Sequence, residues 1–177
     1  MSVTLCRTMD SPIGPLTVAG DGQTVTNLRM TDQTYPPPDQ DRWRHGPVAF
    51  SDAIDQLQAY FDGELTEFDV ALRLEGSTFQ RRVWRALLDI PYGETTSYGE
   101  IARQVGRPGA ARAVGLANGH NPVGIIVPCH RVIGTNGSLT GYGGGLHRKR
   151  ALLQLEQDHF TPRLAPFLVI TPSPIGR

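Results

Sequence analysis

Short apolar runs separated by glycine and proline mark the first thirty residues of the chain. Runs of this length, bounded by turn-forming residues, are typical of strands joined by tight turns. Two of them, 3–9 and 16–19, flank the turn sequence at 11–15, and 24–30 forms a third. The pattern predicts a small sheet at the N-terminus.

The next segments differ in their apolar period. Residues 31–47 contain three consecutive prolines and several aspartates without any apolar period, so we expect an exposed, partly mobile loop. Apolar residues then recur at helical spacing, which predicts an amphipathic helix over 50–62 that ends at Gly63 (Phe50, Ile54, Leu57 and Phe61). Over 66–74 they alternate, which predicts a half-buried strand (Phe68, Val70, Leu72 and Leu74).

The pattern becomes helical after Glu75-Gly76-Ser77, where we expect a domain boundary. A first stripe of Phe79, Val83 and Leu87 follows an N-cap at Ser77 or Thr78. A second helix opens with a capping box, Ser97 and Glu100, and continues as an apolar stripe up to the breaker sequence 106–109 (Tyr98, Ile101, Ala102 and Val105). A third helix is expected over 110–118. Two helices joined by a glycine turn predict a helix-turn-helix.

The 177 residues and the 39% hydrophobic content suit one domain or two small ones with a buried core. No apolar stretch is long enough to cross a membrane, and the N-terminus lacks a secretory signal pattern, so we expect a cytoplasmic protein with reduced thiols. The two cysteines, Cys6 and Cys129, cannot build a disulfide framework or a zinc site.

The balanced charge, seventeen basic and seventeen acidic residues, hides an asymmetry. Ten of the basic residues but only three of the acidic ones lie between positions 78 and 150. A basic C-terminal half beside an acidic N-terminal half indicates contact with a polyanion. A chance split of charge over a solvated surface explains the asymmetry equally well.

The third predicted helix is built from small residues around one long side chain, Arg112. Small residues such as Ala111 and Gly115 let a helix lie deep in a DNA groove, where a single arginine can enter the base stack or a narrow minor groove. A close contact between two helices also favours small residues, so the segment alone leaves both interpretations open. The basic charge favours nucleic acid. Few side chains here could read base edges, so we expect little sequence specificity.

Cys129 follows a short apolar run, 124–127, that we expect to be extended and to end at Pro128. A nucleophilic cysteine must reach the thiolate form, and His130 and Arg131 are the nearest groups that could lower its pKa. Neighbours on an extended chain point to opposite faces, so contact between Cys129 and His130 requires a turn or a water. A histidine base also needs an orienting carboxylate. Taken alone, the pair fits a buried, inert cysteine better.

Taken together, the motifs resemble those of the O6-alkylguanine-DNA alkyltransferases. The resemblance is strong over 78–156 and weaker at the N-terminus (Ala111 to Gly115, Asn121-Pro122, Pro128-Cys129-His130-Arg131-Val132, Pro91-Tyr92-Gly93, Ser97-Tyr98, Gly141-Tyr142, Glu156 and Ser11-Pro12-Ile13-Gly14). It implies an α/β fold: a small ribonuclease-H-like sheet domain at 1–76, and a mainly helical domain with a winged helix-turn-helix at 77–158. A tail at 159–177 follows.

The resemblance also implies a reaction. An alkyl group would move irreversibly from O6-alkylguanine, and less well from O4-alkylthymine, in duplex DNA to Cys129, once per molecule. His130 would be the base, working through a water, and Glu156 would orient it. Tyr98 would help to rotate the nucleotide and would donate to the departing guanine. Asn121 would hold the turn that joins the recognition helix to the active-site segment.

On the same resemblance, Arg112 would fill the gap left by the flipped base, with Ala111 and Gly115 in the minor groove. The pocket for the flipped base would be lined by Pro128, Tyr142 and Gly143, together with the backbone of Val132. No metal and no organic cofactor is implied. The implied partner is double-stranded alkylated DNA, no membrane partner is expected, and we expect a monomer, with clustering along DNA left open.

Other functions stay open at this stage. A non-catalytic sensor of alkylated DNA would lack the acceptor cysteine, which this chain has. A helix-turn-helix regulator would prefer a DNA sequence and would not depend on Cys129. A cysteine hydrolase would turn over many times without DNA. We expect Cys6 to be inert and the three glycines 143–145 to loosen the pocket for bulkier adducts. The apolar residues 167–170 either pack on the body or are mobile.

Overall fold

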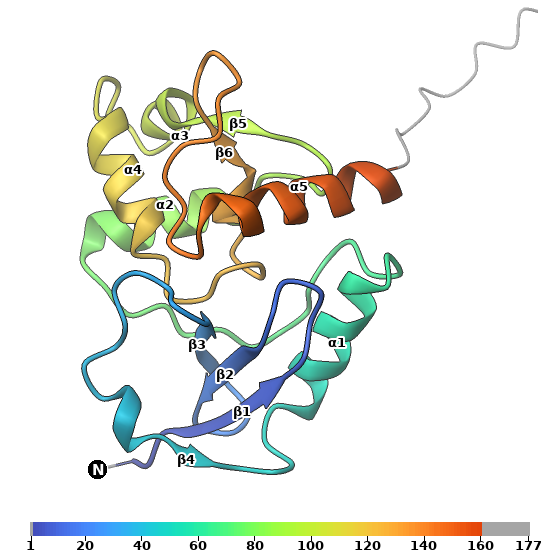
Figure 1. Cartoon of the computed structure of the whole chain (residues 1–177). Helices are drawn as coiled ribbons and strands as arrows, with labels where there is room; N and C mark the ends of the chain where they lie inside the picture. The colour runs from blue at the N-terminus through green and yellow to red at the C-terminus, as the bar shows by residue number, and fades with distance from the viewer. Residues whose placement is uncertain (1, 161–177) are drawn as a thin grey trace, which may run out of the picture.

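A four-stranded sheet forms the N-terminal half of the computed structural model, which describes residues 2–160 (Figure 1). The strand order is β3-β2-β1-β4. Strand β1 (Leu5–Met9) pairs antiparallel with β2 (Leu16–Gly20), and β2 pairs antiparallel with β3 (Val25–Met30). The sheet predicted from the apolar runs is confirmed.

The segment 31–47 is not wholly a loop. It contains a turn of 3-10 helix, η1 (Gln40–Arg42), and strand β4 (Arg44–His45), which runs parallel to β1. The backbone N–H of Arg44 donates to the carbonyl of Thr4 at 2.9 Å. The free edge of β1 offers these hydrogen bonds, so a short strand forms without an apolar period.

Helix α1 (Ser51–Phe61) matches its prediction and buries Leu57 and Tyr60 completely. The strand predicted at 66–74 is wrong, because only Leu72 forms a bridge, to Val25 of β3. Val123, from the second half of the chain, bridges Leu28 on the same strand. The two segments share one edge of β3, so neither extends along it. The alternating apolar side chains of 66–74 are still half-buried against the core.

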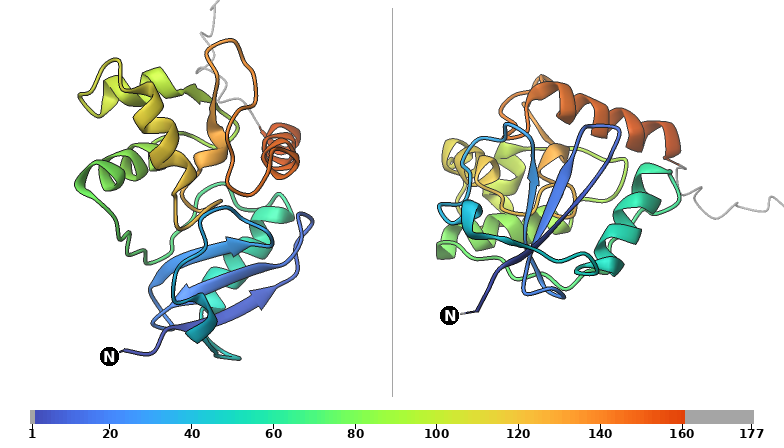
Figure 2. Two further views of the ribbon diagram at one scale, coloured as in Figure 1. Left: turned by 60° about the vertical axis from the view of Figure 1, so that its left-hand side comes forward. Right: turned by 60° about the horizontal axis from the view of Figure 1, so that its bottom comes forward.

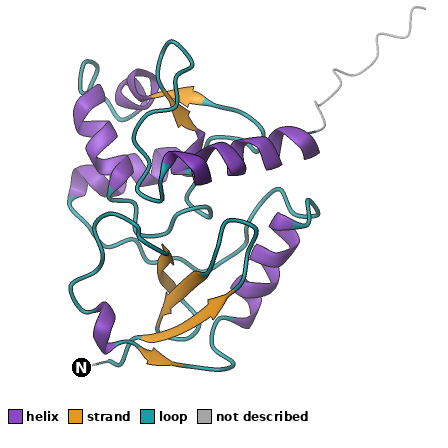
Figure 3. Cartoon of the chain, viewed as in Figure 1, coloured by secondary structure: helices purple, strands orange, loops and turns teal. Residues whose placement is uncertain are grey.

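Helices dominate the second half (Figure 3). They are α2 (Thr78–Leu88), α3 (Tyr98–Gln104), α4 (Ala111–Gly119) and α5 (Leu146–His159). Ser77 and Gln80 form a complete capping box at the start of α2. At α3 only half of the predicted box forms, since the Ser97 hydroxyl accepts from the Glu100 backbone while the Glu100 carboxylate pairs with Arg103.

Helices α3 and α4 form the predicted helix-turn-helix. The turn between them passes through Gly106 at a φ of +74°, a conformation that favours glycine. Beneath the pair, the indole of Trp84 on α2 donates to the carbonyl of Ala117 at 2.8 Å. Two short parallel strands, β5 (Thr96–Ser97) and β6 (Val132–Ile133), tie the start of α3 to the segment that carries Cys129.

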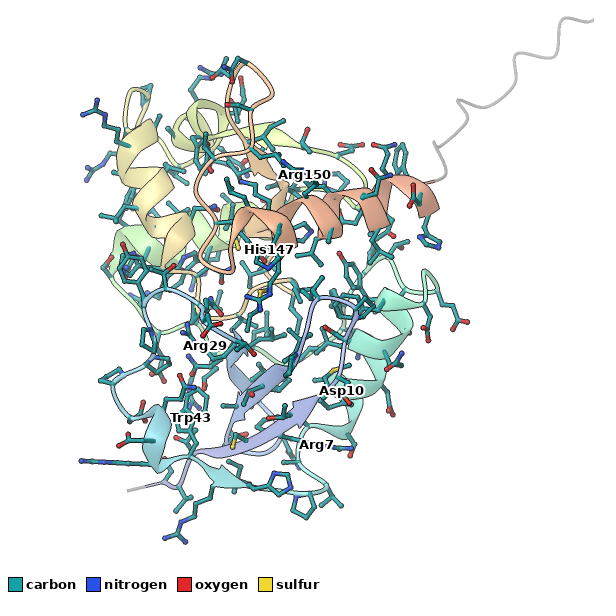
Figure 4. The ribbon with its side chains drawn as sticks, in the orientation of Figure 1. Arg7, Asp10, Arg29, Trp43, His147 and Arg150 are labelled. Carbon is teal, nitrogen blue, oxygen red and sulfur yellow. The ribbon has the colours of Figure 1, made fainter. Side chains whose placement is uncertain are left out.

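Helix α5 runs along the side of the helical half that faces the sheet (Figures 1 and 2). The Tyr60 hydroxyl on α1 donates to Glu156 on α5 at 2.8 Å. Arg148 on α5 donates to the carbonyls of Ile13 (2.9 Å) and Thr31 (2.6 Å). Side chains from the two halves fill the space between them (Figure 4). Hydrogen bonds from α5 thus join the sheet to the helices.

A tight turn replaces the extended run predicted for 124–127. The backbone N–H of Val127 donates to the carbonyl of Val123 at 3.0 Å, and Ile125 has a φ of +71°. The Asn121 side chain closes the turn, since it accepts from the Val123 N–H (3.0 Å) and donates to the Val127 carbonyl (2.8 Å). The apolar run satisfies its backbone within this turn, so it can be buried without joining a sheet.

The expected fold class, an N-terminal sheet domain and a mainly helical C-terminal domain, is confirmed. Over residues 2–160, none of the helices combines the length and apolar character that a bilayer crossing requires. The apolar residues 167–170, for which packing was expected as one alternative, lie outside the described residues.

Candidate active site

The thiol of Cys129 is buried at the start of a 3-10 turn, η2 (Cys129–Arg131). The side-chain amide of Asn118 donates to the carbonyl of Cys129 at 3.2 Å. Burial raises the pKa of the Cys129 thiol to about 11, against the opposing effects of the Asn121 amide and the Lys149 ammonium. The thiol is therefore protonated at neutral pH and needs a base before it can act as a nucleophile.

Glu156 is a buried carboxylate that accepts four hydrogen bonds. Arg131 donates twice, from Nε to Oε2 (2.9 Å) and from Nη2 to Oε1 (2.8 Å). His130 and Tyr60 complete the set at 2.7 and 2.8 Å. Burial alone would raise the pKa of Glu156, but the hydrogen bonds and charges of His130 and Arg131 hold this pKa at about 2. The carboxylate is ionised at all physiological pH values.

His130 is fully buried, and its Nε2 faces the Glu156 carboxylate. Because an ionised carboxylate only accepts hydrogen bonds, Nε2 carries the proton and Nδ1 of the neutral ring keeps a lone pair. Among residues 2–160, Nδ1 has no hydrogen-bond partner. Burial lowers the pKa of His130, and the adjacent carboxylate opposes this shift. The ring is thus a neutral, oriented base with one free nitrogen.

Lys149 is a cation beside the thiol that the sequence analysis missed. Its fully buried Nζ donates to the carbonyls of Val132 (2.6 Å) and Thr140 (2.8 Å). Burial lowers the pKa of Lys149 to about 8, and the negative charge of a Cys129 thiolate would oppose this shift. Arg131, which the sequence favoured as the neighbouring cation, instead pairs with Glu156. The spacing of Lys149, Leu152 and Glu156 along one face of α5 was the available signal.

Tyr98 reaches the same network from the first position of α3. Its hydroxyl donates to the Thr140 carbonyl at 2.8 Å and lies 3.5 Å from the Nζ of Lys149. Burial raises the pKa of Tyr98, so the phenol keeps its proton. The network therefore contains a hydroxyl donor as well as an ammonium.

The expected pocket residues lie on two segments. Pro128 precedes η2, and the Val132 carbonyl accepts from Lys149. Tyr142 and Gly143 belong to the loop before α5, and the Tyr142 hydroxyl lies 4.0 Å from the sulfur of Met30. Burial raises the pKa of Tyr142 well above its ordinary value.

Of the expected DNA-contacting residues, Tyr98 belongs to this network, whereas Arg112, Ala111 and Gly115 lie on α4. Arg112 is exposed, and no hydrogen bond or ion pair holds it within the described part of the chain. Ala111 and Gly115 are half-buried, and a Cβ at Gly115 would lie 3.8 Å from the ring of Tyr98. Helix α4 thus lies close to Tyr98, a residue of this network.

The structure brings together four of the predicted residues, Cys129, His130, Glu156 and Tyr98, and Asn121 closes the turn before Cys129. Two further members of the cluster, Lys149 and Tyr60, were not predicted. Over residues 2–160, no group of three metal-ligating side chains is found. The arrangement offers a thiol, a neutral imidazole oriented by a carboxylate, and a nearby ammonium.

Comparisons with known proteins agree with the resemblance. The family model described as "6-O-methylguanine DNA methyltransferase, ribonuclease-like domain" matches residues 4–74. A second family model, described as "6-O-methylguanine DNA methyltransferase, DNA binding domain", matches residues 78–158. The methylated-DNA–protein-cysteine methyltransferase of Mycobacterium tuberculosis is 68% identical over 161 residues, which cover 91% of this chain and 97% of that protein. The Mycobacterium leprae protein of the same name is 63% identical over 162 residues, 92% and 98% of the two chains.

Solved structures give the same result. The crystal structure of Mycobacterium tuberculosis O6-methylguanine methyltransferase has a TM-score of 0.85 and 68% identity, covering 90% of this chain and 96% of that one. The crystal structure of Mycobacterium tuberculosis OGT in complex with DNA has a TM-score of 0.83 and 69% identity, covering 87% and 93%. By fold, sequence and the residues gathered at the site, the chain belongs to the 6-O-methylguanine DNA methyltransferase family.

Proposed function

We propose that this protein repairs DNA by moving an alkyl group from O6 of guanine, and less well from O4 of thymine, to the sulfur of Cys129. The observation that carries the proposal is the buried thiol next in sequence to a histidine that a carboxylate orients at 2.7 Å. The names of relatives that match over nearly their whole length support the same activity.

The transfer begins with removal of the thiol proton. Nδ1 of His130 accepts it through a water, and the Glu156 carboxylate stabilises the imidazolium that forms. The thiolate sulfur then attacks the alkyl carbon, so an S–C bond forms while the O6–C bond breaks. The bonding electrons stay with the departing guanine, and the Tyr98 hydroxyl donates to the purine as its negative charge develops.

The DNA binds to the helix-turn-helix. An alkylated O6 is inaccessible inside a duplex, so the nucleotide must leave the stack before the thiol can reach it. We place α4 in the minor groove, with Ala111 and Gly115 against the DNA and Arg112 in the gap left by the flipped base. The pocket lined by Pro128, Tyr142, Gly143 and the Val132 backbone then receives the base.

The product is a thioether, which is stable, so each molecule reacts once. The proposal needs neither a metal nor an organic cofactor. The protein acts as a monomer on double-stranded alkylated DNA, and several molecules could still cluster along one duplex. A thiol acceptor also requires a reducing compartment, for which we infer the cytoplasm.

Two single substitutions test the assignment of the acceptor. Cys129→Ser should abolish transfer from an O6-methylguanine duplex while the affinity for that duplex stays within about twofold, because the small change leaves α4 intact. The matched control is Cys6→Ser, in the N-terminal sheet, which should transfer at the rate of the natural protein. Transfer by Cys129→Ser, or its loss in Cys6→Ser, would contradict the assignment.

The alternatives that the sequence left open are not favoured. The relatives with high identity are named as methyltransferases, and the acceptor cysteine that a non-catalytic sensor lacks is present. A regulator would not require a base and carboxylate behind a buried thiol.

A further inference from the structure

The loop 141–145 before α5, which we call the pocket loop, contains four glycines in five residues. Gly141 and Gly145 have φ values of +49° and +90°. Glycine loses more conformational freedom on ordering than any other residue, so such a loop keeps one shape only if other groups hold it. The contacts that hold it therefore set the shape of the pocket wall formed by Tyr142 and Gly143.

Those contacts come mainly from the N-terminal half. Thr34 donates twice to the carbonyl of Gly143, from its backbone N–H at 2.9 Å and from its hydroxyl at 3.0 Å. A Cβ at Gly144 would clash with the sulfur of Met30, so the loop packs directly on the end of β3. Arg148 adds a bond from Nη1 to the Gly144 carbonyl at 3.0 Å.

The segment that carries Thr34 is itself held firmly. Arg29, buried on β3, donates to the carbonyls of Gln33 (3.2 Å) and Tyr35 (3.1 Å), so it points into this segment (Figure 4). The ring of Tyr35 stacks on His120, just after α4, with ring centroids 3.8 Å apart. Adjacent residues of one segment thus contact both the pocket loop and the end of the recognition helix.

We propose that Thr34 is a specificity-determining positioning residue, which holds the pocket wall at Gly143 and so limits the size of the alkyl adduct that the site accepts. This inference rests on the proposed function. It gives the N-terminal half a role in the reaction besides support. A methyl adduct fits without displacing the loop, whereas a benzyl adduct needs the Gly143 wall to move away from the base.

The position of the pocket loop depends on two opposing effects. The hydrogen bonds from Thr34 hold the loop closed, and the conformational freedom of its glycines favours opening. When the Thr34 hydroxyl is removed, the Gly143 carbonyl keeps one of its two donors and the loop opens more often. One net hydrogen bond corresponds to a change of about fivefold in such an equilibrium. The rate with a bulky adduct should rise by that factor, and the rate with methyl should not.

The experiment compares Thr34→Val, which keeps the shape but loses the hydroxyl, with Thr34→Ser, which keeps the hydroxyl. Thr34 is exposed, so neither substitution disturbs the core. The matched control is Thr8→Val, an exposed threonine of the sheet whose hydroxyl pairs with Thr17 at 2.9 Å, away from the pocket loop. For each protein, the rates of transfer from O6-benzylguanine and O6-methylguanine in the same duplex are measured, together with the iodoacetamide reactivity of Cys129.

Thr34→Val should raise the benzyl-to-methyl rate ratio about fivefold, the effect of one net hydrogen bond. Thr34→Ser and Thr8→Val should keep the natural ratio, and the iodoacetamide reactivity should be equal in all four proteins. An unchanged ratio in Thr34→Val, or an equal shift in Thr34→Ser, would overturn the proposal. Absence of methyl transfer by the natural protein would instead overturn the proposed function, so the two failures are distinguishable.

Discussion

Nε2 of His130 and Oε1 of Glu156 lie 2.7 Å apart, and both side chains are almost completely buried. The carboxylate also accepts two hydrogen bonds from Arg131, so His130 and Arg131 together fix its position. This geometry fixes the imidazole tautomer and leaves Nδ1 as its free base. The relationship makes the histidine useful for catalysis and also makes the pair important for stability.

Glu156→Gln should destabilise the protein by about 3–5 kcal/mol, because it leaves the Arg131 guanidinium buried without its counter-charge. Denaturant unfolding measures the change. The matched control is Glu94→Gln, an exposed acidic residue of the same half, which should lie within about 0.5 kcal/mol of the natural protein. A loss below about 1 kcal/mol for Glu156→Gln would contradict the account.

The same carboxylate predicts an acid dependence of stability. The pKa of Glu156 is lowered from 4.5 to about 2 in the folded protein, so the unfolded chain binds the proton more readily. Its contribution is complete above pH 4.5 and is lost as the pH falls towards 2. The stability of Glu156→Gln should fall less steeply than that of the natural protein across this window. Equal slopes would show that Glu156 is not the titrating group.

Lys149→Met should lower the iodoacetamide reactivity of Cys129 at pH 7, because at this pH, below the Lys149 pKa of about 8, the ammonium stabilises the thiolate that reacts. The rate of alkylation of Cys129 at pH 7 measures the effect. Lys149→Arg keeps the charge and should lower this rate less. A faster alkylation in Lys149→Met would contradict the electrostatic role.

Lys149 also predicts how stability changes in base. Its folded pKa of about 8 lies below the ordinary 10.5, so the unfolded chain holds the lysine proton more tightly between these values, and the contribution of Lys149 to stability should rise with pH there. Lys149→Met should lose this rise. If the stability of the variant rose with pH by the same amount, groups other than Lys149 would be responsible for the rise.

Arg112→Ala should slow repair of an O6-methylguanine duplex by about tenfold or more, since the gap left by the flipped base is no longer filled and flipping costs a few kcal/mol. Transfer from the free base, O6-benzylguanine, should keep its rate because no flipping is needed. Comparing the two rate constants tests the role, and Arg150→Ala, an exposed position on α5, serves as the control. Equal slowing of both substrates would contradict it.

Gly143→Ser should lower the rate with a benzyl adduct more than the rate with methyl. A Cβ at Gly143 would lie 3.2 Å from the carbonyl of Gly119, so the added side chain leaves the pocket loop less room to shift when a bulky adduct enters. Parallel single-turnover rates on benzylated and methylated duplexes measure the effect. Benzyl transfer as fast as in the natural protein, or faster, would refute the expected loosening by the glycine run.

Local patterns predicted the elements that depend on local physics. The apolar spacing of Phe50 to Phe61 acts within α1, and the helix it predicts is confirmed. The N-cap of α2 is also local, and of the two candidates, Ser77 and Thr78, it is Ser77. The strand at 66–74 failed because Val123, far along the chain, shares the edge of β3 with Leu72. The extended run at 124–127 failed because the Asn121 side chain closes it into a turn.

The candidate site divides in the same way. Motifs could point to Cys129, His130 and Glu156, since the resemblance spans all three positions. A lysine on a helix is usually exposed, so Lys149 gave no individual signal, although it shares a face with Leu152 and Glu156. The bond from Tyr60 to Glu156 joins residues 96 positions apart, which no local pattern encodes.

The most direct test of the central claim is the mass of the intact protein after reaction with a duplex carrying one O6-methylguanine, followed by digestion to locate the adduct. We expect a gain of one CH2 on the peptide that contains Cys129, saturating at one per molecule. A gain on another peptide, continued turnover, or no gain while the protein still binds the damaged duplex would contradict it.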